Sequence, residues 1–203
     1  MKSIIQLLTL LSCFGMAISP PRAESSQETL LIDNAEGGGI LLNNYRDGEG
    51  KLRVYGPGSG FATTSKKSHS GQHSRGLASS AESPWGAIAI MALKQTDVSA
   101  YSKLQFWLYS VEDYPGCTVS VRLFFSNDSV WVQSCSEGIP LLKGDKNTDG
   151  GWTQVTVSLD ETAFYHEMGK QEFDLTQLDK IGILVNAKYK RAMIYFDDVS
   201  LVK

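Results

Sequence analysis

The stretch Leu104-Gln105-Phe106-Trp107-Leu108-Tyr109 decides the fold class. Successive side chains of a β-strand point to opposite faces, so a strand buried on one side carries apolar residues at every second position. Leu104, Phe106 and Leu108 are expected to face a core, and the odd-numbered residues of the stretch are expected to face away from it. The pattern therefore predicts a half-buried β-strand.

Outward from this stretch, short alternating or apolar runs recur between turn signals. Residues 117–125 and 130–135 flank the polar turn Ser126-Asn127-Asp128-Ser129, which predicts a hairpin. Residues 152–159 alternate in the same way, and residues 193–202 close the pattern. Because no run keeps a helical period and no linker appears, residues 28–203 are predicted to form one all-β domain, a two-sheet antiparallel β-sandwich.

The N-terminus is typical of an export signal. Lys2 gives a short positive region, residues 4–18 are mostly apolar, and cleavage is expected after Ala17 or Ala23. The apolar run is shorter than the about 20 residues of a transmembrane helix. Residues 1–23 are therefore predicted to be a signal peptide, the mature chain to have no transmembrane segment, and the protein to be periplasmic or extracellular. Lipid attachment at Cys13 is the alternative.

Charge and cysteine content narrow the expected chemistry. The formal net charge is -3 and no basic stripe stands out, so nucleic acid is not an expected partner. After signal removal Cys117 and Cys135 remain, at the same end of the predicted hairpin. An even count in an exported protein predicts a disulfide between them, with two buried thiols as the alternative.

The positions opposite the predicted core residues suggest a binding surface. Over three predicted strands they gather aromatic rings together with Arg and Gln side chains, a combination suited to stacking on sugars and bonding their hydroxyl groups. The alternative is that residues 160–175 cover this face and make it a second core. The predicted ligand-binding residues are Trp107, Tyr109, Arg122, Trp131 and Gln133, with Trp85 at the rim.

Enzymatic signatures are lacking. His69, His73 and His166 show no metal-binding spacing, and no nucleophile elbow frames a serine. Asp197 and Asp198 are neighbours on a predicted strand, so they are expected to point to opposite faces and not to act as a pair. The sequence therefore predicts a binding module that is not an enzyme.

Several phrases, in order along residues 30–203, carry a family resemblance. They are Leu31-Ile32-Asp33-Asn34-Ala35-Glu36, His69-Ser70-Gly71-Gln72-His73-Ser74, Asp97-Val98-Ser99-Ala100-Tyr101, Trp152-Thr153-Gln154-Val155-Thr156-Val157, Leu178-Asp179-Lys180-Ile181-Gly182-Ile183 and Ile194-Tyr195-Phe196-Asp197-Asp198-Val199. The chain resembles the jelly-roll carbohydrate-binding modules of the galactose-binding-like superfamily. It is also similar to the complex-I intermediate-associated family, which shares that fold.

The resemblance implies a function and a metal site. It implies non-catalytic binding of a glycan, or, as the alternative, a protein-interaction or assembly module on the same fold. It also implies a structural calcium ion held by Glu36, Asp197 and backbone carbonyls near His73, since calcium takes oxygen ligands of this kind. Asp197, Val199 and Leu201 are expected to share one face of the closing strand, with Asp197 at the rim of the core.

Overall fold

The structure of the chain is a computed structural model that describes nine ranges of residues. These are 28–36, 40–41, 52–56, 58–93, 97–125, 131–134, 138–144, 149–166 and 173–203. For residues 40–41, 52–55, 131–134 and 166 it describes the backbone alone. The expected signal peptide, the lipid-attachment alternative at Cys13, and Cys135 lie outside the described residues.

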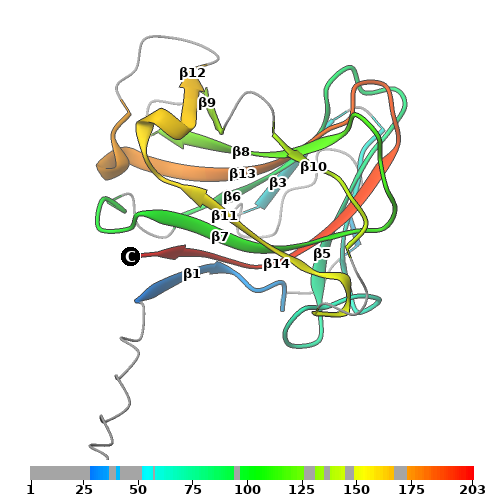
Figure 1. The fold of residues 1–203 in the computed structure, drawn as a ribbon, viewed down its shortest axis with the longest axis horizontal. Helices are drawn as coiled ribbons and strands as arrows, with labels where there is room; N and C mark the ends of the chain where they lie inside the picture. The colour runs from blue at the N-terminus through cyan, green and yellow to red at the C-terminus, as the bar shows by residue number, and fades with distance from the viewer. Residues whose placement is uncertain are drawn as a thin grey trace, which may run out of the picture.

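One of two antiparallel sheets, called sheet A here, has the strand order β11-β7-β14-β5-β4-β2, and β1 also pairs with β14. Its strands are β1 (Thr29–Asp33), β2 (Ile40–Leu41), β4 (Gly60–Thr64), β5 (Ser74–Ser79), β7 (Lys103–Ser110), β11 (Thr153–Ser158) and β14 (Ala192–Val202). Figure 1 shows β1 beside β14, so the first and last described strands lie together in this sheet.

The second sheet, sheet B, has the order β12-β9-β8-β13-β6-β3, with β10 paired to β8. Its strands are β3 (Leu52–Tyr55), β6 (Gly86–Ala92), β8 (Thr118–Phe125), β9 (Trp131–Ser134), β10 (Ile139–Pro140), β12 (Phe164–His166) and β13 (Leu178–Asn186). Three single-turn 3-10 helices, η1 (Asp149–Gly151), η2 (Glu161–Ala163) and η3 (Leu175–Gln177), lie in connections. The predicted two-sheet antiparallel β-sandwich is confirmed.

The core lies between the two sheets and is built by the alternation that the sequence shows. Leu104 and Phe106 from β7 are fully buried against Val119, Val121 and Leu123 from β8. The predicted β8–β9 hairpin is also present, with Arg122 opposite Gln133 and Phe124 opposite Trp131. Within the described ranges, no helix is long and apolar enough to cross a membrane.

Cys117 is buried in this core and carries a free thiol. Its backbone N–H donates to the carbonyl of Tyr114, and its own carbonyl accepts from Leu141. The structure therefore gives no disulfide at Cys117, and its expected partner Cys135 lies outside the described residues. At Cys117 the structure agrees with the alternative of a buried thiol.

A β-bulge in β14 overturns the expected face of Asp197. The register of β14 on β7 shifts between Asp197 and Ser200, and Asp198 sits there in the left-handed region with φ 49°. One extra residue in a strand reverses its alternation. Asp197 therefore pairs with Trp107 on the outer face of sheet A, whereas Val199 and Leu201 face the core.

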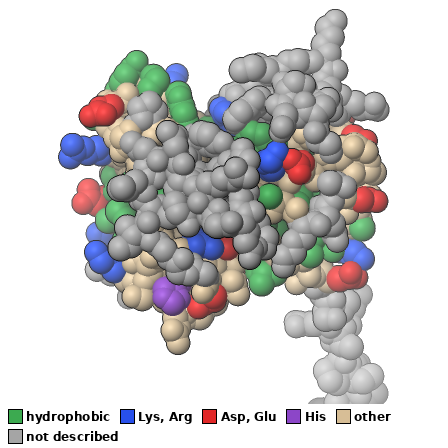
Figure 2. Space-filling view, turned by 180° about the vertical axis from the view of Figure 1, so that it is seen from behind, with side chains coloured by type: hydrophobic (Ala, Val, Ile, Leu, Met, Phe, Trp, Pro, Cys, Tyr) green, Lys and Arg blue, Asp and Glu red, His purple; other side chains and the backbone are tan. Residues whose placement is uncertain are grey.

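Basic and acidic side chains lie interspersed over the described surface of the face shown in Figure 2. Among the described side chains on that face, no large area of a single sign is visible.

Candidate functional site

The predicted aromatic surface is divided between the two sides of the sandwich. β7, which carries Trp107 and Tyr109, belongs to sheet A, whereas β8 and β9, which carry Arg122, Trp131 and Gln133, belong to sheet B. The outer faces of the two sheets point in opposite directions. The prediction that these five residues share one face is wrong, because alternation fixes the parity of each strand but not the sheet to which the strand belongs.

On sheet A, a loop formed by residues 65–73 covers the aromatic residues. The imidazole of His69 stacks on the indole of Trp107 with ring centroids 3.8 Å apart, and Lys67 Nζ lies 4.6 Å from the centroid of the Tyr109 ring. The Trp152 ring contacts the rings of both Tyr109 and His69 and is buried. These rings form a second small core beneath the 65–73 loop, so Trp107 and Tyr109 are covered by a loop that the sequence did not single out for this role.

His69 joins this loop to two other parts of the domain. Its Nδ1 lies 3.0 Å from Asp198 Oδ2 and its Nε2 lies 2.9 Å from Asp149 Oδ2, at the start of η1. Ser70 Oγ donates to the second Asp198 oxygen at 2.6 Å. The bulge thus brings Asp198 to the same loop as Asp197, and the expectation that the two carboxylates point apart is wrong.

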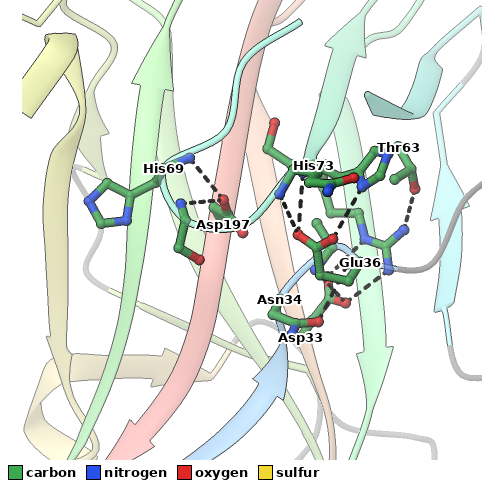
Figure 3. A network of polar contacts seen from close by, with 12 residues as sticks. Asp33, Asn34, Glu36, Thr63, His69, His73 and Asp197 are labelled. Carbon is green, nitrogen blue, oxygen red and sulfur yellow. Dashed lines mark hydrogen bonds and ion pairs between the residues drawn. The ribbon is translucent and has the colours of Figure 1, made fainter. Parts of the chain in front are cut away.

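Asp197 lies beneath the same loop and is 1% exposed. Its Oδ2 accepts hydrogen bonds from the backbone N–H groups of His69 and Ser70, and its Oδ1 accepts one from Asp198. Burial raises the pKa of Asp197, and the neighbouring charge of Asp198 raises it further, against the lowering effect of these N–H donors. Figure 3 shows Asp197 directed at the backbone of the loop.

Glu36 holds the far end of the 65–73 loop. Its Oε1 accepts from the N–H groups of Gln72 and His73, and its Oε2 lies 3.2 Å from His73 Nδ1. These donors hold the pKa of Glu36 below its ordinary value, with the Gln72 N–H as the largest cause. Beside it, Asp33 forms a two-bond ion pair with Arg75, each bond 2.9 Å long (Figure 3).

The contacts that Glu36, Asp197 and His73 make in this structure are not those of a calcium ligand set. Calcium needs six to eight oxygen ligands. The oxygens of Glu36 and Asp197 are instead directed at N–H donors, and His73 contributes its N–H and ring. Within the described residues no group of three or more His, Cys, Asp or Glu side chains is arranged to hold a metal ion. The contacts fit a hydrogen-bonded tether for the loop, and calcium stays a prediction.

On sheet B, the strand registers align one row of outer-face positions across six strands. The row follows from the antiparallel pairings of β12, β9, β8, β13, β6 and β3. It spans about 24 Å, since neighbouring strands lie about 4.8 Å apart. In order its positions are Tyr165, Gln133, Arg122, Gly182, Ile90 and Arg53.

The described side chains of this outer face combine polar and apolar groups. Arg122 is half-buried, and Tyr165, at the edge of the row, is 38% exposed. Further along β8 and β13, the Asn186 amide donates to Ser120 Oγ at 2.9 Å. A separate apolar cluster lies toward β6 on the same face, and its members are Ile88, Ile90, Phe124 and Leu184.

The register places two predicted residues, Trp131 and Gln133, at outer-face positions beside Phe124 and Arg122. Their side chains are outside the described part of the structure. The sequence did not single out Tyr165, because it follows η2 in a segment with no visible period. The two adjacent aromatic residues Phe164 and Tyr165 give no polar-apolar alternation, so the sequence does not show that Phe164 is buried and Tyr165 exposed.

Trp85 lies away from both faces. It stands in the loop between β5 and β6, one residue before Gly86, and is 36% exposed. The structure thus brings Arg122, Gln133 and Trp131 to one face, Trp107 and Tyr109 to the other, and leaves Trp85 at an end of the sandwich.

Comparison with known proteins identifies the class of fold. No protein-family model and no curated protein sequence matches the chain. Among solved structures, it is similar to the family 11 carbohydrate-binding module of the cellulosomal cellulase Lic26A-Cel5E of Clostridium thermocellum, with 16% identity and a TM-score of 0.56 over 88% of this chain and 96% of that chain. A family 30 carbohydrate-binding module matches with 15% identity and a TM-score of 0.55, over 86% of this chain and 98% of that chain.

A larger protein contains a similar unit. An exo-β-agarase matches with 14% identity and a TM-score of 0.52, covering 85% of this chain but 25% of the agarase chain. At such identities the likeness concerns the fold. The chain therefore has the jelly-roll β-sandwich of carbohydrate-binding modules, which is the fold that the sequence resemblance predicted.

Proposed function

We propose that this protein is a non-catalytic carbohydrate-binding module and that it binds a glycan along the outer-face row of sheet B. The observation that carries the proposal is the register that aligns Tyr165, Gln133 and Arg122 on adjacent strands. An aromatic ring beside amide and guanidinium groups supplies a stacking surface and hydrogen-bond donors for sugar hydroxyls. Because Gly182 and Ile90 in the row are buried, the glycan is expected to contact the end of the row formed by Tyr165, Gln133 and Arg122.

A further observation supports this face over the outer face of sheet A. The exposed side of the Trp107 indole is already occupied by His69, and Tyr109 and Trp152 are buried. Among the similar structures, the family 11 module from Clostridium thermocellum was solved in complex with a β-1,3-1,4-mixed-linked tetrasaccharide. A β-glucan is therefore the first ligand to test.

The test measures binding to a panel of polysaccharides that includes β-1,3-1,4-glucan, cellulose and agarose. Tyr165→Ala and Arg122→Ala should each weaken binding to the recognised glycan by about tenfold, the ratio that corresponds to about 1.4 kcal/mol. Gln105→Ala, a change on the outer face of sheet A, is the matched control and should bind as the wild type does. Circular dichroism and melting temperature establish that each variant is folded.

Two results contradict the proposal. Wild-type protein that binds no member of a broad glycan array, yet binds a protein partner saturably, would support the alternative of a protein-interaction module. Glycan binding that survives both sheet B changes and is lost on Gln105→Ala would move the site to sheet A.

We also propose that the protein acts after export, because residues 1–23 have the pattern of a signal peptide. Expression of the full chain in a bacterial host, followed by fractionation and N-terminal sequencing, tests this. Mature protein that begins after Ala17 or Ala23 in the periplasm or medium is the expected result. Full-length protein retained in the cytoplasm would contradict it, and a lipid-modified N-terminus at Cys13 would establish the alternative.

A further inference from the structure

Two of the exposed aromatic side chains lie on neighbouring loops at one end of the sandwich. Trp85, 36% exposed, stands in the loop between β5 and β6, and Tyr189, 65% exposed, stands in the turn between β13 and β14. Among the described residues, neither ring stacks on another ring or on a cation. Both differ in this respect from Trp107 and Tyr109, whose rings are covered by the 65–73 loop.

Backbone hydrogen bonds tie the two loops together. The N–H of Tyr189 donates to the carbonyl of Ser83 at 2.8 Å, and the N–H of Ala187 donates to the carbonyl of Trp85 at 3.3 Å. The two aromatic residues are therefore held on adjacent segments with a fixed relation between their backbones.

Buried serines fix each loop at its base. Ser83 is fully buried, and its hydroxyl bonds both the N–H and the carbonyl of Gly86. In the same way, Ser79 Oγ donates to the carbonyl of Lys190 and accepts from the N–H of Ala192. Preorganised loops lose little conformational entropy when a ligand binds, which favours their use as binding surfaces.

Tyr189 also has a backbone conformation that its residue type disfavours. Its φ is 54°, in the left-handed region, where glycine and asparagine are the usual residues and a bulky side chain is uncommon. A residue held in such a conformation with its ring projecting into solvent is an observation that points to function. Asparagine would adopt this conformation with less strain, so the fold does not require a tyrosine at this position.

We propose that Trp85 and Tyr189 form a second carbohydrate-contact site at the end of the sandwich. The inference rests on the proposed function and adds a site separate from the sheet B row. Trp85 precedes Ile90 of that row by five positions along the chain, about 17 Å at about 3.3 Å per residue of β-strand. Two separate contacts on one polysaccharide chain raise its apparent affinity through effective concentration.

The surroundings favour a sugar over a protein surface. The two rings are flanked along the chain by exposed charged residues, Glu82 in one loop and Lys188 and Arg191 in the other, instead of a continuous apolar patch. Protein interfaces have depleted charge at their centres. Leu142, on the loop that follows β10, is an apolar side chain that is 66% exposed, and it serves as the control residue in the experiment.

The experiment is affinity electrophoresis in gels that contain the polysaccharide bound by the wild type, with soluble β-1,3-1,4-glucan as the first probe. Trp85→Ala and Tyr189→Asn should each reduce retention by about tenfold, an upper figure for loss of one aromatic contact. Tyr189→Asn is chosen because asparagine suits the left-handed conformation, so the variant keeps its fold. Tyr189→Phe should restore retention, and Leu142→Ala is the matched control that should leave it unchanged.

Isothermal titration with the β-1,3-1,4-mixed-linked tetrasaccharide separates the two sites. A Tyr165→Ala variant that still binds with one site fewer, and a Trp85→Ala variant that also loses one site, would support two independent sites. Full wild-type retention and stoichiometry in both Trp85→Ala and Tyr189→Asn overturn the end site while the sheet B proposal stands. A wild type that binds no glycan overturns both. A Leu142→Ala variant that loses as much retention as Trp85→Ala shows that the loss is not specific to the two aromatic side chains, and it overturns the end site.

Discussion

The imidazole of His69 lies nearly parallel to the indole of Trp107, with 3.8 Å between ring centroids and 15° between ring planes. The same imidazole contacts Asp198 through Nδ1 and Asp149 through Nε2. One side chain therefore joins the 65–73 loop, the bulge of β14 and η1 above the outer face of sheet A. These contacts explain why aromatic residues predicted to be open to ligand are covered.

Replacing His69 should uncover Trp107. His69→Ala removes the ring stack and two polar contacts, and we expect a loss of about 2 kcal/mol in the free energy of unfolding, from an aromatic pair and hydrogen bonds to charged groups. Urea denaturation measures this loss, and acrylamide quenching of tryptophan emission should rise. His73→Ala, at the more exposed end of the loop, should have the smaller effect, and equal effects would show that the stack is not what holds the loop.

Asp197 predicts a stability that falls with rising pH. Its pKa is raised above the ordinary value of 3.8 by burial and then by the charge of Asp198. The folded state therefore keeps this proton to a higher pH than the unfolded state does, and the contribution of Asp197 declines as pH rises from 3.8 through the raised pKa. Relative to the wild type, Asp197→Asn should become more stable across that window, as followed by urea denaturation from pH 3 to 7.

Glu36 predicts a pH dependence of the opposite sign, a stability that falls as pH falls. Its pKa is lowered from 4.5, chiefly by the N–H of Gln72 and next by the His73 ring. The stability it contributes is therefore present above pH 4.5 and is lost as pH falls through the lowered pKa. Glu36→Gln should lose stability against the wild type near pH 7 and recover it in acid. Parallel pH curves for the wild type and this variant would show that the tether to the 65–73 loop does not form in solution.

Gly86 should not tolerate a side chain. Its φ is 121°, and a Cβ there would lie 1.8 Å from the carbonyl oxygen of Val185. Gly86→Ala is expected to lower the free energy of unfolding by more than about 2 kcal/mol, because the conformation and the contact both disfavour it. Gly60→Ala is the control, since the nearest atom to its added Cβ is 3.9 Å away. Similar chemical denaturation midpoints for the two variants would contradict the predicted contact.

Calcium binding is tested by chelation. The sequence resemblance implies an ion at Glu36 and Asp197, and a ligand that binds only the folded state raises the melting temperature by mass action. Melting curves of the wild type and Asp197→Ala, each with EDTA and with added calcium, separate this from the hydrogen-bonded tether. A melting temperature that calcium raises only in the wild type establishes the ion. An unchanged wild type, with Asp197→Ala less stable in every condition, establishes the tether alone.

The sequence by itself determined the core faces of β7 and β8 and the pairing of β8 with β9. Leu104 and Phe106, Val119 and Val121 alternate with polar or aromatic residues, and burial of one face per strand is enough to fix which side chains enter the core. The short polar segment 126–129 predicts that the strands on either side of it pair with each other, and Arg122 and Gln133 were therefore placed together correctly.

Only the tertiary structure decided which strands share a sheet, and therefore which outer-face residues lie on the same side of the sandwich. The chain crosses from sheet A to sheet B between β7 and β8, and alternation carries no information about that crossing, so Trp107 and Arg122 were wrongly joined. The bulge at Asp198 depends on the fit of β14 against β7, and a single extra residue there turned Asp197 outward. The 65–73 loop has no period at all, and its position over Trp107 follows from long-range hydrogen bonds to Asp197 and Asp198 that no local pattern records.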